Sequence, residues 1–342
     1  MRALKICIVS TTSAQAKTGN RITAVRWAKV LRALGHRVRI EQQYGGSSYD
    51  LMIALHARRS QTSIRRFRRK YPDLPLILAL TGTDIYGDLS WNRTAQRSLQ
   101  LATRLVVLQP RAIDRLPKNL QSKTVAIFQS AVAPKTFAHA RDGAFEVCVI
   151  SNLRAVKDPL RAALAARLLP NDSRIRLLHV GGALDESLAR RARRESRLNG
   201  RYRWLGEVGH FQALRTLQRS RLLVLSSKME GGANVIGEAV VCGVPVLASR
   251  IEGSVGLLGR EYLGYFEVGD TRGLARLLLR AERDSAFLRH LTRQCQQRAR
   301  YFRPEREKAA WRRLLISARR ATRETDPGRA RRQARPGISK SR

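Results

Sequence analysis

Short apolar runs bounded by turn residues recur along the chain, and each predicts a buried β-strand. Between the runs lie longer stretches, such as 19–34 and 60–71, whose spacing of apolar positions fits helices. Strands that alternate with helices predict parallel sheets covered by helices on both faces, and therefore an α/β fold. The predicted strands are 4–9, 37–40, 51–55, 76–80, 104–108, 124–128, 146–150, 174–180 and 222–225.

A chain of 342 residues is long enough for two domains, each with its own core. Pro134, His139 and Gly143 interrupt the apolar pattern within 131–143, so we expect domains at 1–140 and 141–300. Helices with a break near Phe302 follow. The basic segment 319–342 has too little apolar surface to offset the entropy of ordering, and we expect it to be disordered.

The segment after the 222–225 strand carries the most chemical information. Asn234 predicts the N-cap of a helix over 235–242, so the glycine turn before it directs backbone N–H groups toward one point, as a phosphate requires. Glu238 lies one turn into that helix, where a carboxylate can accept two hydrogen bonds from a ribose diol. Together they indicate a nucleotide site; the alternative is a capped surface helix with a tight turn.

Composition changes this picture little. The net charge of +40 invites a nucleic-acid interpretation, but the 55 arginines and 11 lysines are spread along the chain and form no nucleic-acid-binding motif. Anionic small substrates, or contact with an anionic membrane, fit this charge better. We keep a basic scaffold without catalysis as an alternative.

Localisation and metal binding follow from what the sequence lacks. No apolar run approaches the length of a membrane span, and the N-terminus resembles a first strand instead of a secretion signal. The four cysteines are each more than fifty residues from the next and form no metal-type cluster, which suits buried thiols in a reducing cytoplasm. No D-x-D motif occurs. We expect a soluble, cytoplasmic protein that uses no metal.

The spacing E-x7-E from Glu230 to Glu238, followed by the G-x-P-V strand signature of Gly243, Pro245 and Val246, resembles the family-four group of GT-B glycosyltransferases. This resemblance implies two Rossmann-like, doubly wound domains facing a central cleft, with helix 301–318 returning toward the first domain. It also implies that Glu238 holds the donor ribose and that Glu230 lies by the donor sugar. The turn residues assigned to the diphosphate are Gly231, Gly232, Ala233 and Asn234.

The loop 151–158 resembles the family pattern G-R-L-x-x-x-K-G, in which arginine and lysine grip the donor diphosphate. Lys157 matches the lysine, whereas Asn152 stands in place of the arginine and Arg154 lies two residues later. Two cations on one loop suit a diphosphate, and the alternative is a solvated basic loop. Gly182, after the 174–180 strand, is expected near the same diphosphate.

Candidate acceptor and catalytic residues follow the strands of the first domain. Asp84 could orient a nucleophile, take a proton or bind sugar hydroxyls; the alternative is a local cap. His56 could contact the donor sugar or stabilise the leaving phosphate; the alternative is a strand-end histidine with satisfied hydrogen bonds. We expect an anion pocket at the turn before the first helix, beside Lys17. The expected acceptor residues are Gly19, Asn20, Arg21, Arg58, Arg59, Thr81 and Thr83.

Several longer phrases narrow the resemblance to one subgroup, the selenosugar synthases of bacterial selenoneine biosynthesis. They cover 19–24, 54–60, 80–86 and 229–235, within a likeness that extends from about residue 3 to about residue 280. The resemblance implies a C–Se bond-forming transferase that takes UDP-N-acetylglucosamine or UDP-glucose as donor and selenophosphate as acceptor. Its product would be a 1-seleno-sugar.

We therefore expect an enzyme whose partners are small-molecule substrates, with no cofactor, no specific nucleic acid and at most peripheral membrane contact. The alternative within enzymes is a family-four O-glycosyltransferase acting on a small or lipid-linked acceptor.

Overall fold

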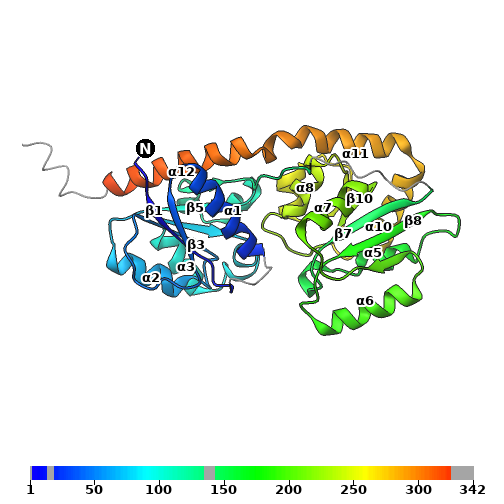
Figure 1. The fold of residues 1–342 in the computed structure, drawn as a ribbon, viewed down its shortest axis with the longest axis horizontal. Helices are drawn as coiled ribbons and strands as arrows, with labels where there is room; N and C mark the ends of the chain where they lie inside the picture. The colour runs from blue at the N-terminus through cyan, green and yellow to red at the C-terminus, as the bar shows by residue number, and fades with distance from the viewer. Residues whose placement is uncertain (1, 14–18, 135–142, 325–342) are drawn as a thin grey trace, which may run out of the picture. The chain divides into compact units, whose positions relative to one another are not determined.

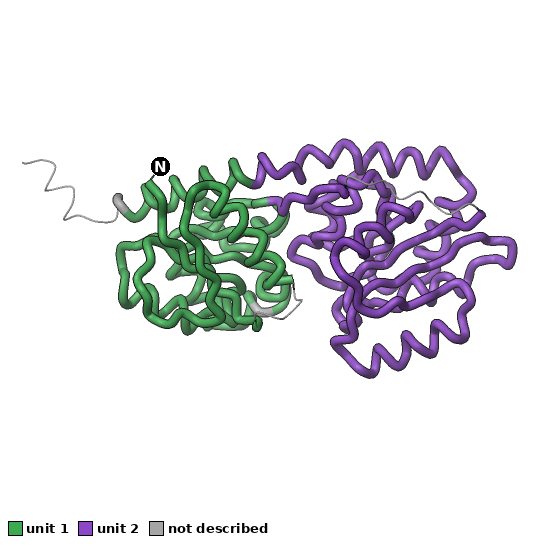
Figure 2. The backbone as a smooth tube through the Cα atoms, viewed as in Figure 1, with its two compact units in different colours: residues 1–127, 308–342 green, residues 128–307 purple. Residues whose placement is uncertain are grey.

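The computed structural model describes residues 2–13, 19–134 and 143–324, which divide into two compact units. Unit 1 comprises residues up to Ile127 and from Lys308 onward, and unit 2 comprises residues 128–307 (Figure 2). Each unit contains a sheet of six parallel strands with helices between most successive strands (Figure 1). This confirms the α/β class predicted from the alternating apolar runs.

Unit 1 has the strand order β2-β1-β3-β4-β5-β6, so the chain reverses direction across the sheet between β1 and β3. Strands β3 and β4 are buried along their whole length, as continuous apolar runs predict for the centre of a parallel sheet. The elements are β1 Lys5–Val9, α1 Gly19–Ala33, β2 Arg37–Glu41, β3 Leu51–Leu55, α2 Gln61–Lys70, β4 Leu76–Leu80, the π-helix η1 Asp84–Asp88, α3 Arg93–Leu101, β5 Arg104–Val107, the 3₁₀ helix η2 Pro110–Arg115, α4 Lys118–Gln121 and β6 Thr124–Ala126.

Alternate residues of the unit 1 strands supply two separate cores. Ile6 and Ile8 of β1 belong to a core that contains Trp27 of α1 and Trp311 of α12, whose rings meet edge to face at 4.8 Å. Cys7 faces the other way, into a core with residues of α2 and α3. Each fully buried large apolar side chain contributes roughly 1.5–3 kcal/mol, so the two cores together stabilise unit 1.

Helix α12, Pro304–Glu324, begins in unit 2 and belongs to unit 1 from Lys308 onward. The sequence predicted disorder from Arg319, but the helix continues to Glu324. Extending an existing helix costs far less than starting one, and the buried Ala318 anchors the turn before this extension. Residues 325–342 lie outside the described ranges.

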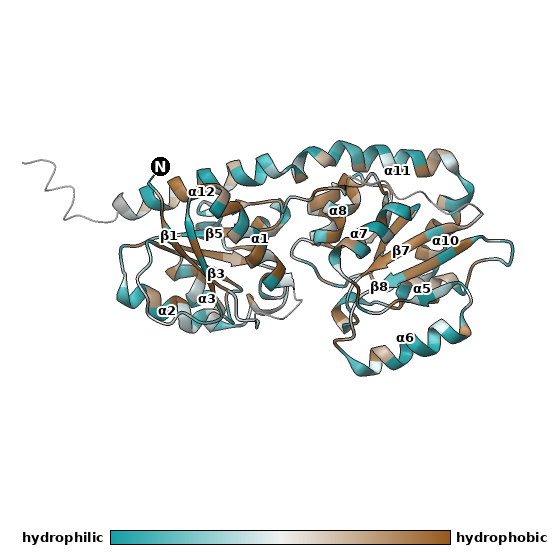
Figure 3. Cartoon of the chain, viewed as in Figure 1, coloured by the Kyte–Doolittle hydropathy of each residue, from teal (hydrophilic) through white to brown (hydrophobic). Residues whose placement is uncertain are grey.

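Unit 2 has the order β12-β11-β10-β7-β8-β9, so successive strands run outward from β7 to one side and from β10 to the other. Figure 3 shows the hydrophobic character of β7 and the mostly hydrophilic surface of α6. The elements are β7 Phe145–Ile150, the 3₁₀ helix η3 Ala155–Lys157, α5 Arg161–Ala166, β8 Ile175–Val180, α6 Glu186–Leu198, β9 Tyr202–Trp204, α7 His210–Arg219, β10 Leu222–Leu225, α8 Asn234–Val241, β11 Val246–Ser249, α9 Glu252–Leu258, β12 Tyr265–Phe266, α10 Thr271–Arg283, α11 Ser285–Arg298 and the 3₁₀ helix η4 Ala299–Phe302.

Along the chain, unit 1 ends at Ile127, thirteen residues before the boundary expected at residue 140. The reason is packing: the Phe128 ring stacks on Tyr301 at 5.3 Å and meets Phe302 at 5.7 Å. The Ser130 amide also donates to Glu307 Oε2 at 2.8 Å. The first residues after β6 are therefore part of unit 2.

None of the helices in the described ranges is long and apolar enough to cross a lipid bilayer.

Candidate functional site

In unit 2 the strand order reverses between β7 and β10, and the loops that follow these two strands leave the same edge of the sheet. Ligands of doubly wound sheets bind at such a reversal, outside the carboxyl ends of the strands. The loop after β7 carries Arg154 and Lys157, and the loop after β10 carries Glu230 and leads into α8. Residues predicted from separate motifs therefore lie at one place in the fold.

Lys157 and Glu230 form an ion pair in which Lys157 Nζ donates to Glu230 Oε1. Ser227 Oγ donates to the same carboxylate oxygen at 2.7 Å. The lysine side chain is 26% exposed and the glutamate 10%, so the pair is shielded but open to a ligand on the lysine side. The structure thus brings together two residues that the sequence analysis assigned to the donor diphosphate and the donor sugar.

Backbone contacts fix the position of Lys157. It ends the short helix η3, and the next residue, Asp158, adopts a left-handed backbone with φ of 44°. This conformation is costly for a residue other than glycine, and it is held by Ser226 Oγ, which donates to the Asp158 carbonyl at 2.8 Å. Arg161 Nε binds the Asp158 carboxylate at 2.7 Å. The lysine is therefore presented by a loop that is tied to both neighbouring segments.

Glu230 is held from the side of β11 as well. Ser249 Oγ donates to the Ser227 carbonyl at 2.5 Å, which fixes the residue whose hydroxyl binds the Glu230 carboxylate. A Cβ on Gly253 would lie only 2.2 Å from the Glu230 carbonyl oxygen, so helix α9 packs directly on this backbone. Ser227 is three residues from Glu230 in the sequence, whereas Ser249 and Gly253 come from later segments, so no local pattern predicts their supporting role.

Asn152 explains the departure from the arginine of the family pattern. Its Oδ1 accepts a hydrogen bond from the Gly182 amide at 3.0 Å, while the Leu153 amide donates to the Gly182 carbonyl at 2.9 Å. The residue ties the loop after β7 to the turn after β8. Arg154 is exposed in the same loop, and its expected contact with the diphosphate stays a prediction.

The turn Gly181–Gly182 makes this junction possible. A Cβ on Gly181 would lie 1.8 Å from the Ser151 carbonyl oxygen, so only glycine fits there. A Cβ on Gly182 would lie 3.1 Å from Glu207 Oε2. Glu207 therefore belongs to the surroundings of the predicted donor residue Gly182. No local pattern marks this residue, because the strand β9 before it is only three residues long.

Helix α8 begins at Asn234, one residue earlier than predicted, and its N-cap is Ala233. Ala233 has no side chain that could cap the helix, and the correction arises because Asn234 already has helical geometry. The Asn234 side-chain oxygen is buried and has no hydrogen-bond partner among the described residues. The turn formed by Gly231, Gly232 and Ala233 thus ends in backbone N–H groups and a side-chain acceptor that a ligand can use.

Glu238 lies one turn into α8, as predicted, and its side chain is half-buried. Burial, and then the neighbouring Glu238 carboxylate, raise the pKa of the Cys242 thiol to about 11. The Glu238 carboxylate and the Cys242 thiol, four residues apart, therefore lie on the same face of the helix. Cys242 stays a neutral thiol at physiological pH.

His179 supports the loop after β7 from beneath. Its ring is fully buried, and burial lowers its pKa to about 4 despite a hydrogen bond to Ser151. Nε2 lies 2.9 Å from the Ser151 carbonyl and Nδ1 lies 2.8 Å from the Tyr202 hydroxyl. A carbonyl only accepts, so Nε2 carries the proton and Nδ1 accepts from tyrosine. These contacts join residues 23 and 28 positions apart, so no local pattern predicts this buried network.

In unit 1, Asp84 is completely buried and its carboxylate is surrounded by backbone donors. It accepts from the amides of Ala57, Thr81, Gly82 and Ile85 at 2.9–3.1 Å. The carboxylate thereby joins the loops that follow β3 and β4. This geometry favours the cap that the sequence analysis held as the alternative to a direct catalytic role.

His56 lies in the first of these loops with a left-handed backbone, φ 76°, and a buried side chain. Its Nε2 is 3.1 Å from Thr83 Oγ1, and its Nδ1 accepts from the Arg59 amide at 3.4 Å. A positive φ is uncommon for a residue other than glycine, so the surrounding hydrogen bonds help to hold this conformation. The predicted residues Thr81, Thr83, Asp84 and His56 do come together.

The remaining predicted acceptor residues are basic or flank helix α1. Arg58 and Arg59 are exposed in the loop after β3. Helix α1 begins at Gly19, followed by Asn20 and Arg21, and the Nε atom of Arg21 is buried without a hydrogen-bond partner among the described residues. Lys17 lies outside the described residues. An anion pocket at this position stays a prediction.

Comparison with known proteins gives a family match that covers most of unit 2. Residues 134–301 match the family model of glycosyl transferases group 1. An N-acetyl-alpha-D-glucosaminyl L-malate synthase of Bacillus anthracis is 29% identical over 143 residues, which are 42% of this chain and 37% of that protein. The match therefore spans well under half the length of this curated relative.

Solved structures resemble the chain over nearly its whole length. Anabaena Alr3699/HepE in complex with UDP and glucose gives a TM-score of 0.72 at 16% identity, covering 92% of this chain and all of that one. Sucrose-phosphate synthase from Thermosynechococcus elongatus gives 0.73 at 16% identity, covering 92% and 98%. At this identity the likeness establishes the fold, which is the two-domain GT-B type.

Proposed function

We propose that this chain, in which residues 134–301 match the glycosyl transferases group 1, transfers a sugar from a UDP-sugar to a small anionic acceptor. More specifically, the acceptor is selenophosphate and the product is a 1-seleno-sugar, as the resemblance of the phrases at 19–24, 54–60, 80–86 and 229–235 implies. The donor is UDP-N-acetylglucosamine or UDP-glucose.

The observation that carries this proposal is the Lys157–Glu230 pair at the strand reversal of unit 2, next to a turn that leads into α8. A diphosphate needs positive charge and N–H donors, and Lys157 and the amides of the turn supply both. Glu230 holds the ammonium group in place before the donor binds. With the donor present, its carboxylate accepts from hydroxyl groups of the donor sugar.

Glu238 and Asn234 complete the proposed donor site. Glu238 accepts hydrogen bonds from the ribose hydroxyls. The buried Asn234 oxygen has no partner among the described residues, and it accepts a hydrogen bond from an N–H or hydroxyl group of the UDP-sugar. The exposed Arg154 adds a second positive charge near the pyrophosphate. These groups bind charge that increases on the leaving UDP, so they stabilise the transition state without a metal ion.

Unit 1 supplies the proposed acceptor site. The cations Arg21, Arg58 and Arg59 suit an acceptor with several negative charges. His56 and the hydroxyls of Thr81 and Thr83 donate to the acceptor or to the donor sugar. Asp84, whose carboxylate already binds four amides, keeps these loops in place.

The proposed chemistry needs little help with proton transfer. Selenium of selenophosphate is a soft, ionised nucleophile, so its electron pair attacks the anomeric carbon as the bond to the UDP oxygen breaks. Water then cleaves the Se–P bond, which releases phosphate and leaves the 1-seleno-sugar. Within the described residues no cluster of three metal-ligating side chains occurs, and metal independence and a cytoplasmic location stay predictions.

The test is to incubate the purified protein with each UDP-sugar and with selenophosphate generated enzymatically. We expect UDP release that depends on selenophosphate and a selenosugar of the expected mass by mass spectrometry. UDP release without a selenium product would remove selenophosphate as the acceptor but leave the donor site intact. No UDP release with any acceptor would contradict transferase function.

One comparison favours a second candidate. The curated relative is an N-acetyl-alpha-D-glucosaminyl L-malate synthase, and its name describes transfer to a small organic acid. We therefore include UDP-N-acetylglucosamine with L-malate as a separate arm of the same assay. A glycosylated malate, with no selenosugar in the parallel arm, would identify an O-glycosyltransferase.

A further inference from the structure

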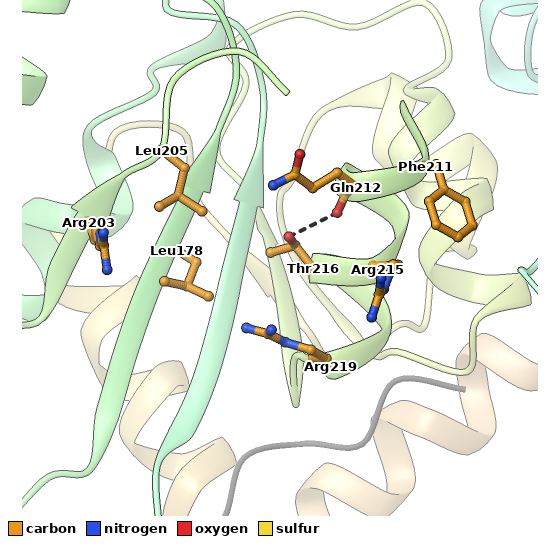
Figure 4. Close-up of a pocket in the computed structure, with 8 residues that line it drawn as sticks. All are labelled: Leu178, Arg203, Leu205, Phe211, Gln212, Arg215, Thr216 and Arg219. Carbon is orange, nitrogen blue, oxygen red and sulfur yellow. Dashed lines mark hydrogen bonds between the residues drawn. The ribbon is translucent and has the colours of Figure 1, made fainter. Parts of the chain in front are cut away.

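Unit 2 contains a second concave surface, a pocket of about 600 Å³ between helix α7 and the strands β8 and β9 (Figure 4). This volume is typical of sites that bind small organic molecules. Three of the lining side chains are apolar, namely Leu178, Leu205 and Phe211. Three others carry guanidinium groups, namely Arg203, Arg215 and Arg219.

Strand register and helix period together create this combination. Leu178 of β8 is the direct neighbour of Arg203 on β9, so both side chains lie on one face of the sheet. Phe211, Arg215 and Arg219 are spaced four residues apart on α7 and form one stripe along the helix. Both the sheet side and the helix side of the pocket therefore combine an apolar and a basic side chain.

The charges of the pocket are poorly balanced. Glu146 is the carboxylate paired with these arginines, at 3.5 Å from Arg219, and its side chain is 7% exposed. Arg219 Nε is buried without a hydrogen-bond partner among the described residues. Arg203 and Arg215 are exposed, and the Arg215 guanidinium lies 6.0 Å from the Phe211 ring. Among the described residues, three guanidinium groups thus face one paired carboxylate, and an anion would neutralise the positive charge that is left.

The pocket is separate from the proposed donor site. Its side chains come from Leu178 within β8, from Arg203 and Leu205 in and after β9, and from one face of α7, whereas the donor residues follow the carboxyl ends of β7, β8 and β10. His179, next to Leu178 in β8, points to the opposite face and binds the Ser151 carbonyl beneath the donor loop. A ligand can thus occupy the pocket while a nucleotide is bound.

We propose that this pocket is a second ligand site, which takes an amphipathic organic anion: an aromatic or aliphatic body with a sulfonate, phosphate or carboxylate head. The body contacts Leu178, Leu205 and Phe211. The head accepts charge-assisted hydrogen bonds from the arginines, which fork toward such oxygens.

The probe is 8-anilino-1-naphthalenesulfonate. It is titrated into the full-length protein at physiological ionic strength with saturating UDP, and its fluorescence is measured. We expect saturable one-to-one binding that UDP does not displace. Neutral N-phenyl-1-naphthylamine has the same rings without the sulfonate and should bind at least about tenfold more weakly. Equal binding of the neutral compound, or displacement by UDP, would overturn the proposal.

Charge reversal at the exposed arginines locates the site. The double variant Arg203→Glu with Arg215→Glu should weaken sulfonate binding at least about tenfold. The control, Arg191→Glu with Arg194→Glu, changes the total charge equally at exposed positions of α6 and should bind as the parent does. Circular dichroism of both variants checks folding, and unchanged affinity in the folded pocket variant would refute this site.

Discussion

The buried, neutral His179 should make the free energy of unfolding depend on pH in a measurable way. Its pKa is about 4 in the folded protein and about 6.5 in the unfolded chain. Because the fold depresses this pKa, the contribution to stability is present above pH 6.5 and is lost as the pH falls toward 4. Linkage gives a loss of about 2 kcal/mol between pH 7 and pH 5 from this group alone.

The assay compares the native chain with His179→Gln in urea at pH 7 and pH 5. Hydrogen-exchange labelling of peptides from β7 and β8 reports the unfolding of unit 2 separately. Hydrogen bonds that glutamine fails to make lower the stability at both pH values, and carboxylate titration affects both proteins, so both effects cancel in the difference.

The pH-dependent loss should therefore be about 2 kcal/mol smaller in His179→Gln than in the native chain. His290→Gln, at an exposed position of α11, serves as the control and should keep the native pH dependence. An identical loss in the native chain and in His179→Gln would refute a neutral, buried imidazole under the donor loop.

Three further outcomes are expected. Lys157→Ala should lower kcat/KM for the UDP-sugar by about tenfold to a hundredfold. The control Lys228→Ala, at an exposed neighbouring position, should leave it unchanged. Equal kinetics in both variants and the native chain would remove Lys157 from the site. Gly181→Ala should destabilise unit 2 by more than about 2 kcal/mol, because its Cβ collides with the Ser151 carbonyl. Gly209→Ala meets no atom within 4 Å, so similar urea midpoints for the two variants would contradict the close contact. Activity should survive EDTA, and a loss that Mg²⁺ restores would refute metal independence.

The central strands could be predicted from sequence because their physical signal is strong. The strands Leu51–Leu55, Leu76–Leu80 and Leu222–Leu225 are buried along their length and appear as continuous apolar runs. The edge strands Tyr202–Trp204 and Tyr265–Phe266 are two or three residues long and only partly buried, so no such run marks them. Strand length and position in the sheet decide what a local pattern reveals.

The candidate site divides in the same way. The family resemblance implies that Glu230, Glu238 and Lys157 lie near one ligand, and the structure shows Lys157 and Glu230 in contact. The supports of these residues depend on contacts between distant segments: Ser249 lies 22 residues from the carbonyl that it binds, and His179 lies 28 residues from Ser151. Such pairs are set by the register of the assembled sheet, which no local pattern encodes.

Asp84 shows the limit of inference from residue type. A carboxylate after a parallel strand suggested chemistry, yet its oxygens bind four backbone amides. The same residue type fits both roles, and only the positions of the neighbouring N–H groups distinguish them.

The central claim is that unit 2 holds a uridine diphosphate with its ribose against Glu238. The most direct measurement is isothermal titration of UDP and of 2′-deoxyuridine diphosphate into the native chain and into Glu238→Ala. We predict that the native chain binds UDP at least about tenfold more tightly than the deoxy compound, and that Glu238→Ala binds the two equally. The same preference for UDP in both proteins would contradict the claim.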